Sequence, residues 1–246
     1  MPSWFLGVIA AVAAVAGAIA SVASAGVDSL ITPALSLETD MRTAVLAVSA
    51  PHLVFNALRC WTIRDRISWK VFRRFGLASA IGSLGGALLH QVASSGWITV
   101  VFAVLLIIAG LFGITGFAER ARLGRRGAYV GGALSGFFGG LTGEQGGLRA
   151  AAMLGLGCEK EVFVATATAT AIVVDLVRLP VYVATRWSDL PEAIAPALVS
   201  SAGVVVGVLA GGRVLRKVPQ HRFGQVVSAV LLLIGALMIV RLFIGR

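Results

Sequence analysis

The stretch "VVDLVRLPVY" places Asp175 and Arg178 three residues apart inside an apolar run. On a helix this spacing puts both side chains on one face. The earlier stretch "VFNALRCWTI" repeats the spacing with Asn56 and Arg59. Asp175 and Arg178 can form a local ion pair, or Arg178 can bind an anion while Asp175 orients it or exchanges a proton. Because both copies retain the arginine and only one retains the acid, we favour an anion site. Arg59 can also extend to the membrane interface.

A second group of charges accompanies glycines. "GGLTGEQGGLRAAAM" contains Glu144 and Arg149, and "SAGVDSLITPAL" contains Asp28. The glycines predict a broken helix, which is tolerated at membrane depth where protein or a water-filled cavity surrounds it. Amides at the start of a helix suit an anion. The alternative is a loop at the membrane surface, which would accommodate these charges cheaply.

His52 lies one turn before Asn56, on the same face, and is either a proton relay or a hydrogen-bonded structural residue. Thr170 and Ser49 can line a cavity or bond to their own helices. His90 lies near a segment end, where we expect the interface. The expected substrate-binding residues are Arg178, Arg59, Arg149, Asn56, Thr170, Ser49, Gly146 and Gly147. The candidates for proton coupling are Asp175, Glu144, Asp28 and His52.

The elements that position these residues are membrane helices. The chain has 246 residues, 58% of them hydrophobic and 13% charged, and a mean hydropathy of +0.92. This is too apolar for a soluble core and predicts an all-α polytopic membrane protein. The apolar segments fall at about 4–25, 43–63, 75–93, 97–117, 128–157, 162–185, 193–212 and 223–240.

The chain reads as one transmembrane domain, 1–246, made of two repeats, about 1–118 and 127–246. Asn56 falls on Asp175 and Arg59 on Arg178 when the halves are offset by 119 residues. Each half is expected to hold a broken, re-entrant helical hairpin and three transmembrane helices. That odd number of crossings inverts one repeat relative to the other. Whether residues 1–37 span the membrane or re-enter it stays open.

Basic residues gather in three short loops, 64–74, 119–126 and 213–222. An inverted repeat puts all three on one side, which the positive-inside rule makes the cytoplasmic side. We therefore expect the bacterial cytoplasmic (inner) membrane, with the lipid bilayer as surroundings and homo-oligomerisation left open. Because the net charge of +10 lies in these loops, we do not expect a nucleic-acid partner.

Chemical motifs of other classes are lacking. The two cysteines form no framework for disulfides or metal, and there is no G-x-S-x-G, H-E-x-x-H or nucleotide-binding motif. We expect no metal, no cofactor and no enzymatic activity. An intramembrane enzyme and a membrane scaffold or assembly protein without transport remain alternatives. A scaffold has little reason to retain ionisable groups that cost about 2.5–3.5 kcal/mol each at mid-depth.

Each half combines a break, a Thr/Ser-rich helix ending in N/D-x-x-R, and a later G-x-x-x-G. This pattern, with the tail "GGRVLRKVPQHRFGQVVSAVLLLIGALMIVR", resembles the sulfite exporter TauE/SafE family of permeases over almost the whole chain. The resemblance implies a secondary transporter for a small sulfur-containing anion such as sulfite, thiosulfate or a sulfonate (sulfoacetate or taurine). We expect transport by alternating access about the repeat interface, driven by gradients, with protons as the candidate coupling ion. The breaks depart from the family pattern: the first is almost without glycine, and the second lacks the proline.

Overall fold

The computed structural model describes residues 1–22, 27–116, 124–144, 146–154, 156, 159–215 and 220–244. Helices form nearly all of this part of the chain, and it contains no strand. The first five α-helices are α1 (Ser3–Val22), α2 (Val27–Leu35), α3 (Met41–Ile63), α4 (Trp69–Val92) and α5 (Ser95–Thr115). The next five are α7 (Arg125–Thr142), α8 (Gly146–Leu154), α9 (Lys160–Thr185), α10 (Leu190–Leu215) and α11 (Gln220–Ile244). Two single-turn 3-10 helices, η1 (Arg64–Arg66) and η2 (Trp187–Asp189), precede α4 and α10.

Seven helices of the described ranges are long and apolar enough to cross a membrane: α1, α3, α4, α5, α9, α10 and α11. Their length and hydropathy confirm an all-α, multi-pass membrane protein. The three transmembrane helices expected in the first half are α3, α4 and α5. The first helix, α1, is a fourth candidate there. The inverted relation of the halves stays a prediction.

The long apolar run at 128–157 is divided into two helices, as its glycines predict. The chain leaves α7 after Thr142 and begins α8 at Gly146. Gly143 makes the turn with φ +85°, a left-handed conformation that residues with a Cβ rarely adopt. The first half has an equivalent pair, α1 and α2, although the connecting residues 23–26 lie outside the described part. The short helices match, since α2 and α8 both begin and both end 119 residues apart.

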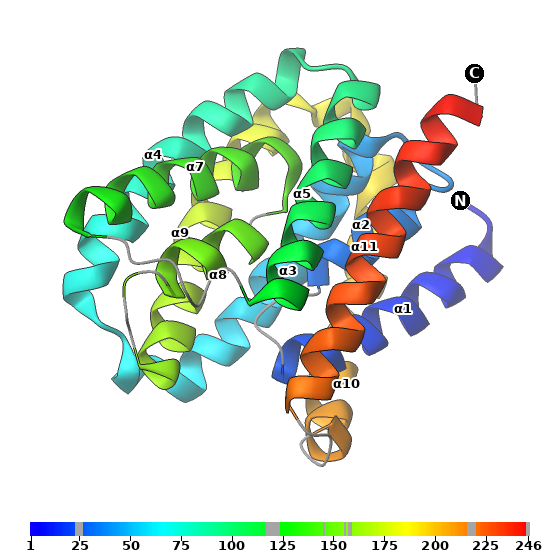
Figure 1. Ribbon diagram of the computed structural model, residues 1–246. Helices are drawn as coiled ribbons and strands as arrows, with labels where there is room; N and C mark the ends of the chain where they lie inside the picture. The colour runs from blue at the N-terminus through cyan, green and yellow to red at the C-terminus, as the bar shows by residue number, and fades with distance from the viewer. Residues whose placement is uncertain are drawn as a thin grey trace.

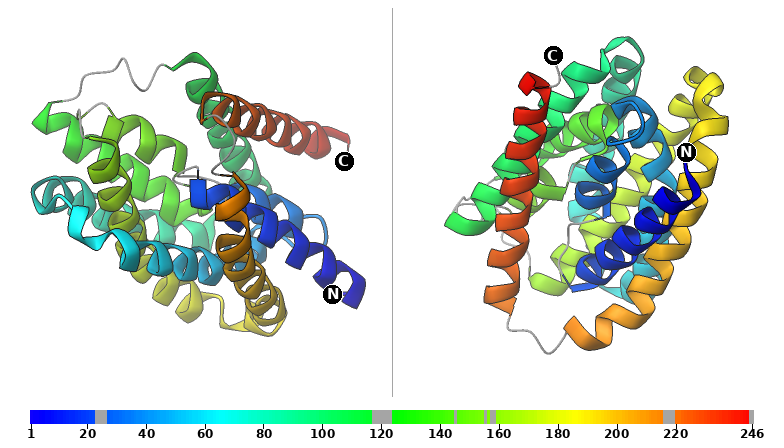
Figure 2. Two further views of the ribbon diagram at one scale, coloured as in Figure 1. Left: turned by 90° about the horizontal axis from the view of Figure 1, so that it is seen from below. Right: turned by 90° about the vertical axis from the view of Figure 1, so that its right-hand side faces the viewer.

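Each half places its first helix against a helix of the other half. α7 lies along α4 (Figure 1), and α1 lies along α10 (Figure 2). Small residues allow these close approaches, which lipid-embedded helices require for good packing. A Cβ on Gly136 of α7 would overlap the Ser79 carbonyl of α4, and one on Gly207 of α10 would overlap the Ala14 carbonyl of α1.

The third helices of the two halves, α3 and α9, pack against one another in the interior. α10 also contacts α3, and α4 contacts α9. α5 pairs with α11 (Figure 2). The arrangement puts the N/D-x-x-R stretches of α3 and α9 beside both broken helix pairs. The predicted basic loops at 119–126 and 213–222, like Cys158, lie wholly or partly outside the described residues, so their side of the membrane stays a prediction.

Candidate functional site

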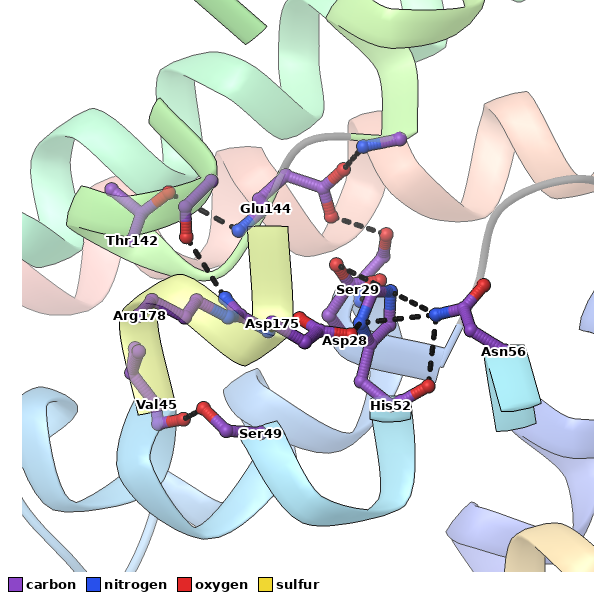
Figure 3. A network of polar contacts seen from close by, with 12 residues as sticks. Asp28, Ser29, Val45, Ser49, His52, Asn56, Thr142, Glu144, Asp175 and Arg178 are labelled. Atoms are coloured by element: carbon purple, nitrogen blue, oxygen red, sulfur yellow. Dashed lines mark hydrogen bonds and ion pairs between the residues drawn. The ribbon is translucent and has the colours of Figure 1, made fainter. Parts of the chain in front are cut away.

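A polar cluster lies where α2, α3, α8 and α9 meet, in an otherwise apolar bundle (Figure 3). The predicted charged residues there are almost wholly buried: Asp28, His52, Glu144, Arg149, Asp175 and Arg178. Arg59 is partly buried beside them. Charges buried to this extent must be paired or hydrogen-bonded, so each neighbour contributes to stability.

His52 joins two aspartates from opposite sides. Its Nδ1 lies 2.7 Å from Asp175 Oδ2 of α9, and its Nε2 lies 3.6 Å from Asp28 Oδ2 of α2. The other carboxylate oxygen of Asp175 pairs with Arg178 Nη2 at 2.8 Å. Asn56 donates from Nδ2 to the His52 carbonyl at 2.8 Å, one turn earlier. The chain of contacts from α2 through α3 to α9 gives a proton on His52 a carboxylate on each side.

Glu144 closes the second break. It accepts at Oε1 from the Gly146 amide at 2.9 Å and at Oε2 from the Ser29 hydroxyl at 2.5 Å. The protein's own carboxylate therefore occupies the positive N-terminal end of α8, where we expected a substrate anion. Asp28 stands in the first turn of α2 and accepts from the Ser29 amide at 3.2 Å. Each short helix thus has an acid at or just before its start. The hydrogen bond from Ser29 to Glu144 connects the start of α2 with the start of α8.

Arg178 is directed toward the end of α7. Its Nη1 donates to the Gly139 carbonyl at 2.8 Å, and Asp175 holds its Nη2. Tyr182 donates to the adjacent Gly140 carbonyl, and His90 Nδ1 lies 2.7 Å from the Leu141 carbonyl oxygen. The interfacial position expected for His90 is wrong: its exposed fraction is 0%, because α7 ends beside it.

A small cavity of about 20 Å³ lies beside the cluster. That volume is roughly enough for one water molecule. The polar residues that line it are Asp28, Asn56, His52, Arg59, Arg149 and Thr168, with Gly146 at one end. Arg149 Nη1 and Asp28 Oδ2 are buried without a hydrogen-bond partner in the described structure. Buried polar atoms in this state indicate a place for a ligand or water.

Only some of the predicted substrate-binding residues line this cavity in the described structure. Arg59, Arg149, Asn56 and Gly146 line the cavity, together with the proton-coupling candidates His52 and Asp28. The described lining does not include Arg178, whose role as a ligand stays a prediction.

Gly147 packs against Ala109 of α5. Ser49 donates to Val45 O at 2.9 Å and Thr170 to Thr166 O at 2.8 Å. These hydroxyls bond within their own helices, which is the packing alternative that the sequence left open for them.

Sequence reasoning missed Ser29, Tyr182 and Thr168 as members of the site. Ser29 follows Asp28 directly, so its position in the first turn of a short helix was an available signal. Tyr182 lies one turn after Arg178 on the same face of α9. Nothing in the spacing of Thr166, Thr168 and Thr170 shows which of them reaches the cavity. Within the described ranges, no group of His, Cys, Asp and Glu is placed to hold a metal ion.

The fold and the buried cluster define a multi-pass membrane protein with a polar cavity at the centre of its helices. The family model of the sulfite exporter TauE/SafE matches residues 9–238. The chain therefore belongs to the sulfite exporter TauE/SafE family, a family of transporters. Searches among curated proteins and solved structures found no match to the chain.

Proposed function

We propose that the chain is a secondary transporter that carries a small sulfur-containing anion across the bacterial cytoplasmic membrane. The observation that carries this proposal is the buried guanidinium of Arg149 beside the cavity, whose Nη1 has no hydrogen-bond partner among the described residues. Arg59 lines the same cavity, and each arginine is exposed to the charge of the other. An anion in this cavity would offset the repulsion between the two arginines and accept charge-assisted hydrogen bonds from Arg149. Sulfite, thiosulfate, sulfoacetate and taurine all present sulfur-bound oxygens for such contacts.

The charges of the cluster support coupling to protons. Three arginines, Arg59, Arg149 and Arg178, face three carboxylates, Asp28, Glu144 and Asp175. A proton on His52 gives this otherwise balanced set one net positive charge. A monovalent anion restores neutrality, so a proton and an anion enter or leave the low-dielectric interior together at least cost.

The cavity is about 20 Å³, room for about one water molecule, so transport of a larger anion requires the surrounding elements to move. The broken helix pairs α1–α2 and α7–α8, with three further helices each, form the two repeats of the proposed mechanism. Residues of both repeats line the cavity, among them Arg59 from the first and Arg149 from the second. Rocking of one repeat against the other would expose it to each side in turn. We place loops 64–74, 119–126 and 213–222 on the cytoplasmic side.

The test is ligand-induced stabilisation of the purified protein in detergent, with sulfite, thiosulfate, sulfoacetate, taurine and chloride as probes. A ligand of the native state raises the unfolding temperature by mass action. Arg149→Gln removes the charged donors and is expected to weaken binding about 10- to 100-fold, from about 1.5–3 kcal/mol for hydrogen bonds to a charged group.

Arg73→Gln is the matched control, because Arg73 is exposed on α4 and should leave the shift unchanged. The proposal fails if folded wild-type protein responds to no sulfur anion, or if Arg149→Gln responds as wild type does. Anion uptake into vesicles then separates a transporter from a scaffold that binds anions.

A further inference from the structure

The arginines of the two N/D-x-x-R stretches make the same contact in both halves. Arg59 Nη1 donates to the Ala20 carbonyl at 2.9 Å, and Arg178 Nη1 donates to the Gly139 carbonyl at 2.8 Å. Ala20 lies in the last turn of α1 and Gly139 in the last turn of α7. The two carbonyls are 119 residues apart, as are the two arginines. One contact has therefore been retained in the two copies, together with the arginine that makes it.

Helix ends explain why such a contact is needed. The last carbonyls of a helix lack partners within the helix, and the C-terminal end carries partial negative charge. In α7 the Gly139 carbonyl accepts from the Gly143 amide at 3.0 Å, and Arg178 is its second donor. At a protein surface water satisfies these carbonyls, but Ala20 and Gly139 are both buried inside the bundle. A buried arginine supplies donors and the complementary charge. Its long side chain reaches across from the neighbouring third helix.

In the second copy, several side chains contact the end of α7. Three successive carbonyls of α7, from Gly139 to Leu141, face side chains of Arg178, Tyr182 and His90. Asp175 fixes the orientation of Arg178. In the first copy Arg59 stacks over Phe55 at 5.7 Å. Asn56 takes the place of Asp175, and its amide donates to the His52 carbonyl.

We propose that Arg59 and Arg178 are positioning residues that hold the ends of the broken helices α1 and α7, rather than the groups that give the anion its affinity. Arg178 fixes the point at which the chain turns at Gly143 toward Glu144 and α8, and hence toward Arg149. Arg59 does the same for α1 from the wall of the cavity. This inference rests on the proposed function for its kinetic consequences: Arg149 sets anion affinity, and the two positioning arginines set the rate of the conformational step.

The kinetic test compares conservative variants of each role, using sulfite as the probe. Arg178→Lys retains the charge but loses the fork that reaches Asp175 and Gly139 together. It should lower turnover in vesicles about tenfold, the effect of one hydrogen bond of about 1.4 kcal/mol, and change the sulfite Kd less than about threefold. Tyr182→Phe, which removes one donor to the same helix end without a change of charge, should lower turnover in the same direction and leave Kd unchanged. Arg149→Lys should instead raise Kd about tenfold. Loss of affinity in Arg178→Lys equal to that in Arg149→Lys, at unchanged maximal turnover, would overturn the inference.

Hydrogen exchange separates this inference from the proposed function, because it needs no substrate. Arg178→Lys and Tyr182→Phe should speed exchange in peptides that cover the end of α7 and the start of α8, and leave peptides of α1 and α2 unchanged. Arg59→Lys should show the reverse pattern. If wild-type protein transports no anion while these patterns appear, the proposed function fails and the positioning role stands. Unchanged exchange at both breaks in all three variants, in folded protein, refutes the positioning role whatever the substrate is.

Discussion

Asp175→Asn is the substitution for which the structure predicts the largest loss of stability. The exposed fraction of Asp175 is 0%. Its carboxylate pairs with Arg178 at 2.8 Å and lies 2.7 Å from His52 Nδ1. An asparagine of the same size removes the charge but not the space, so Arg178 remains buried with the Gly139 carbonyl as its described partner. Breaking a buried ion pair in this way costs about 3–5 kcal/mol.

The assay is thermal unfolding in detergent, followed by the loss of monodisperse protein on size exclusion. For a chain of this size about 2–4 °C is expected per kcal/mol, so Asp175→Asn should lower the midpoint by roughly 6–20 °C. Unfolding of such a protein is commonly irreversible, so all variants are heated at one rate. Asn56→Ala, at the equivalent position of the first copy, is the control. Since Asn56 carries no charge, its loss should cost about 0.5–1.5 kcal/mol, the net contribution of a neutral hydrogen bond.

A double substitution tests whether Asp175 and Arg178 contribute to stability as one unit. Asp175→Asn with Arg178→Met removes both charges and should recover part of the stability lost in Asp175→Asn, because no unpaired ion remains in the interior. A loss below about 1 kcal/mol in Asp175→Asn, or additive losses in the double variant, would refute the view that the two residues form one buried unit. In that case water would solvate Asp175 and Arg178, and the free-energy cost of breaking a buried ion pair would not apply to them.

Two further predictions concern the cluster and the packing. His52→Gln should abolish the pH dependence of thiosulfate binding, which in wild-type protein strengthens as the pH falls and His52 binds a proton. Thiosulfate is the probe because, unlike sulfite, it does not titrate in the pH range of histidine. A pH series of the thermal shift measures this, and an unchanged slope would exclude His52 as the coupling group. Gly136→Ala should lower the unfolding midpoint by the equivalent of about 1–3 kcal/mol, because a Cβ there overlaps the Ser79 carbonyl. Gly7→Ala is its control, since no atom lies within 4 Å of a Cβ at Gly7, and equal behaviour of the two variants would argue against close contact between α4 and α7.

Composition and glycine content predicted the parts of the fold that depend on backbone chemistry. A long apolar run in lipid has to be helical, because its amides and carbonyls find no water. The glycines and charges between Gly139 and Arg149 cannot continue such a helix at low cost, and the chain breaks there. The residues at which the short helices α2 and α8 begin could not be predicted as easily. Side chains on either side of a break do not follow one helical periodicity.

Side-chain partners could not be predicted in the same way. The spacing of Asp175 and Arg178 fixes the face of α9 on which they lie, but it carries no information about the element that covers this face. That element is the end of α7, which explains the direction of Arg178 and also the burial of His90. Ser29 meets Glu144 across 115 residues of sequence, and no local pattern connects these two positions. Such contacts follow from how the two halves interlock, which a spacing within one helix does not describe.

Comparison of the two copies separates structural charges from functional ones. At the 119-residue offset that relates Arg59 to Arg178 and α2 to α8, both arginines and their carbonyl contacts are retained. The groups beside the cavity are not: Asp28 falls on Gly147, Arg149 on Leu30 and His52 on Ala171. A feature that both halves need to fold is expected twice, whereas a single substrate bound between the halves needs its charges once. The unrepeated residues are therefore the ones that the anion and its proton should contact, and the repeated arginines hold the helices that carry them.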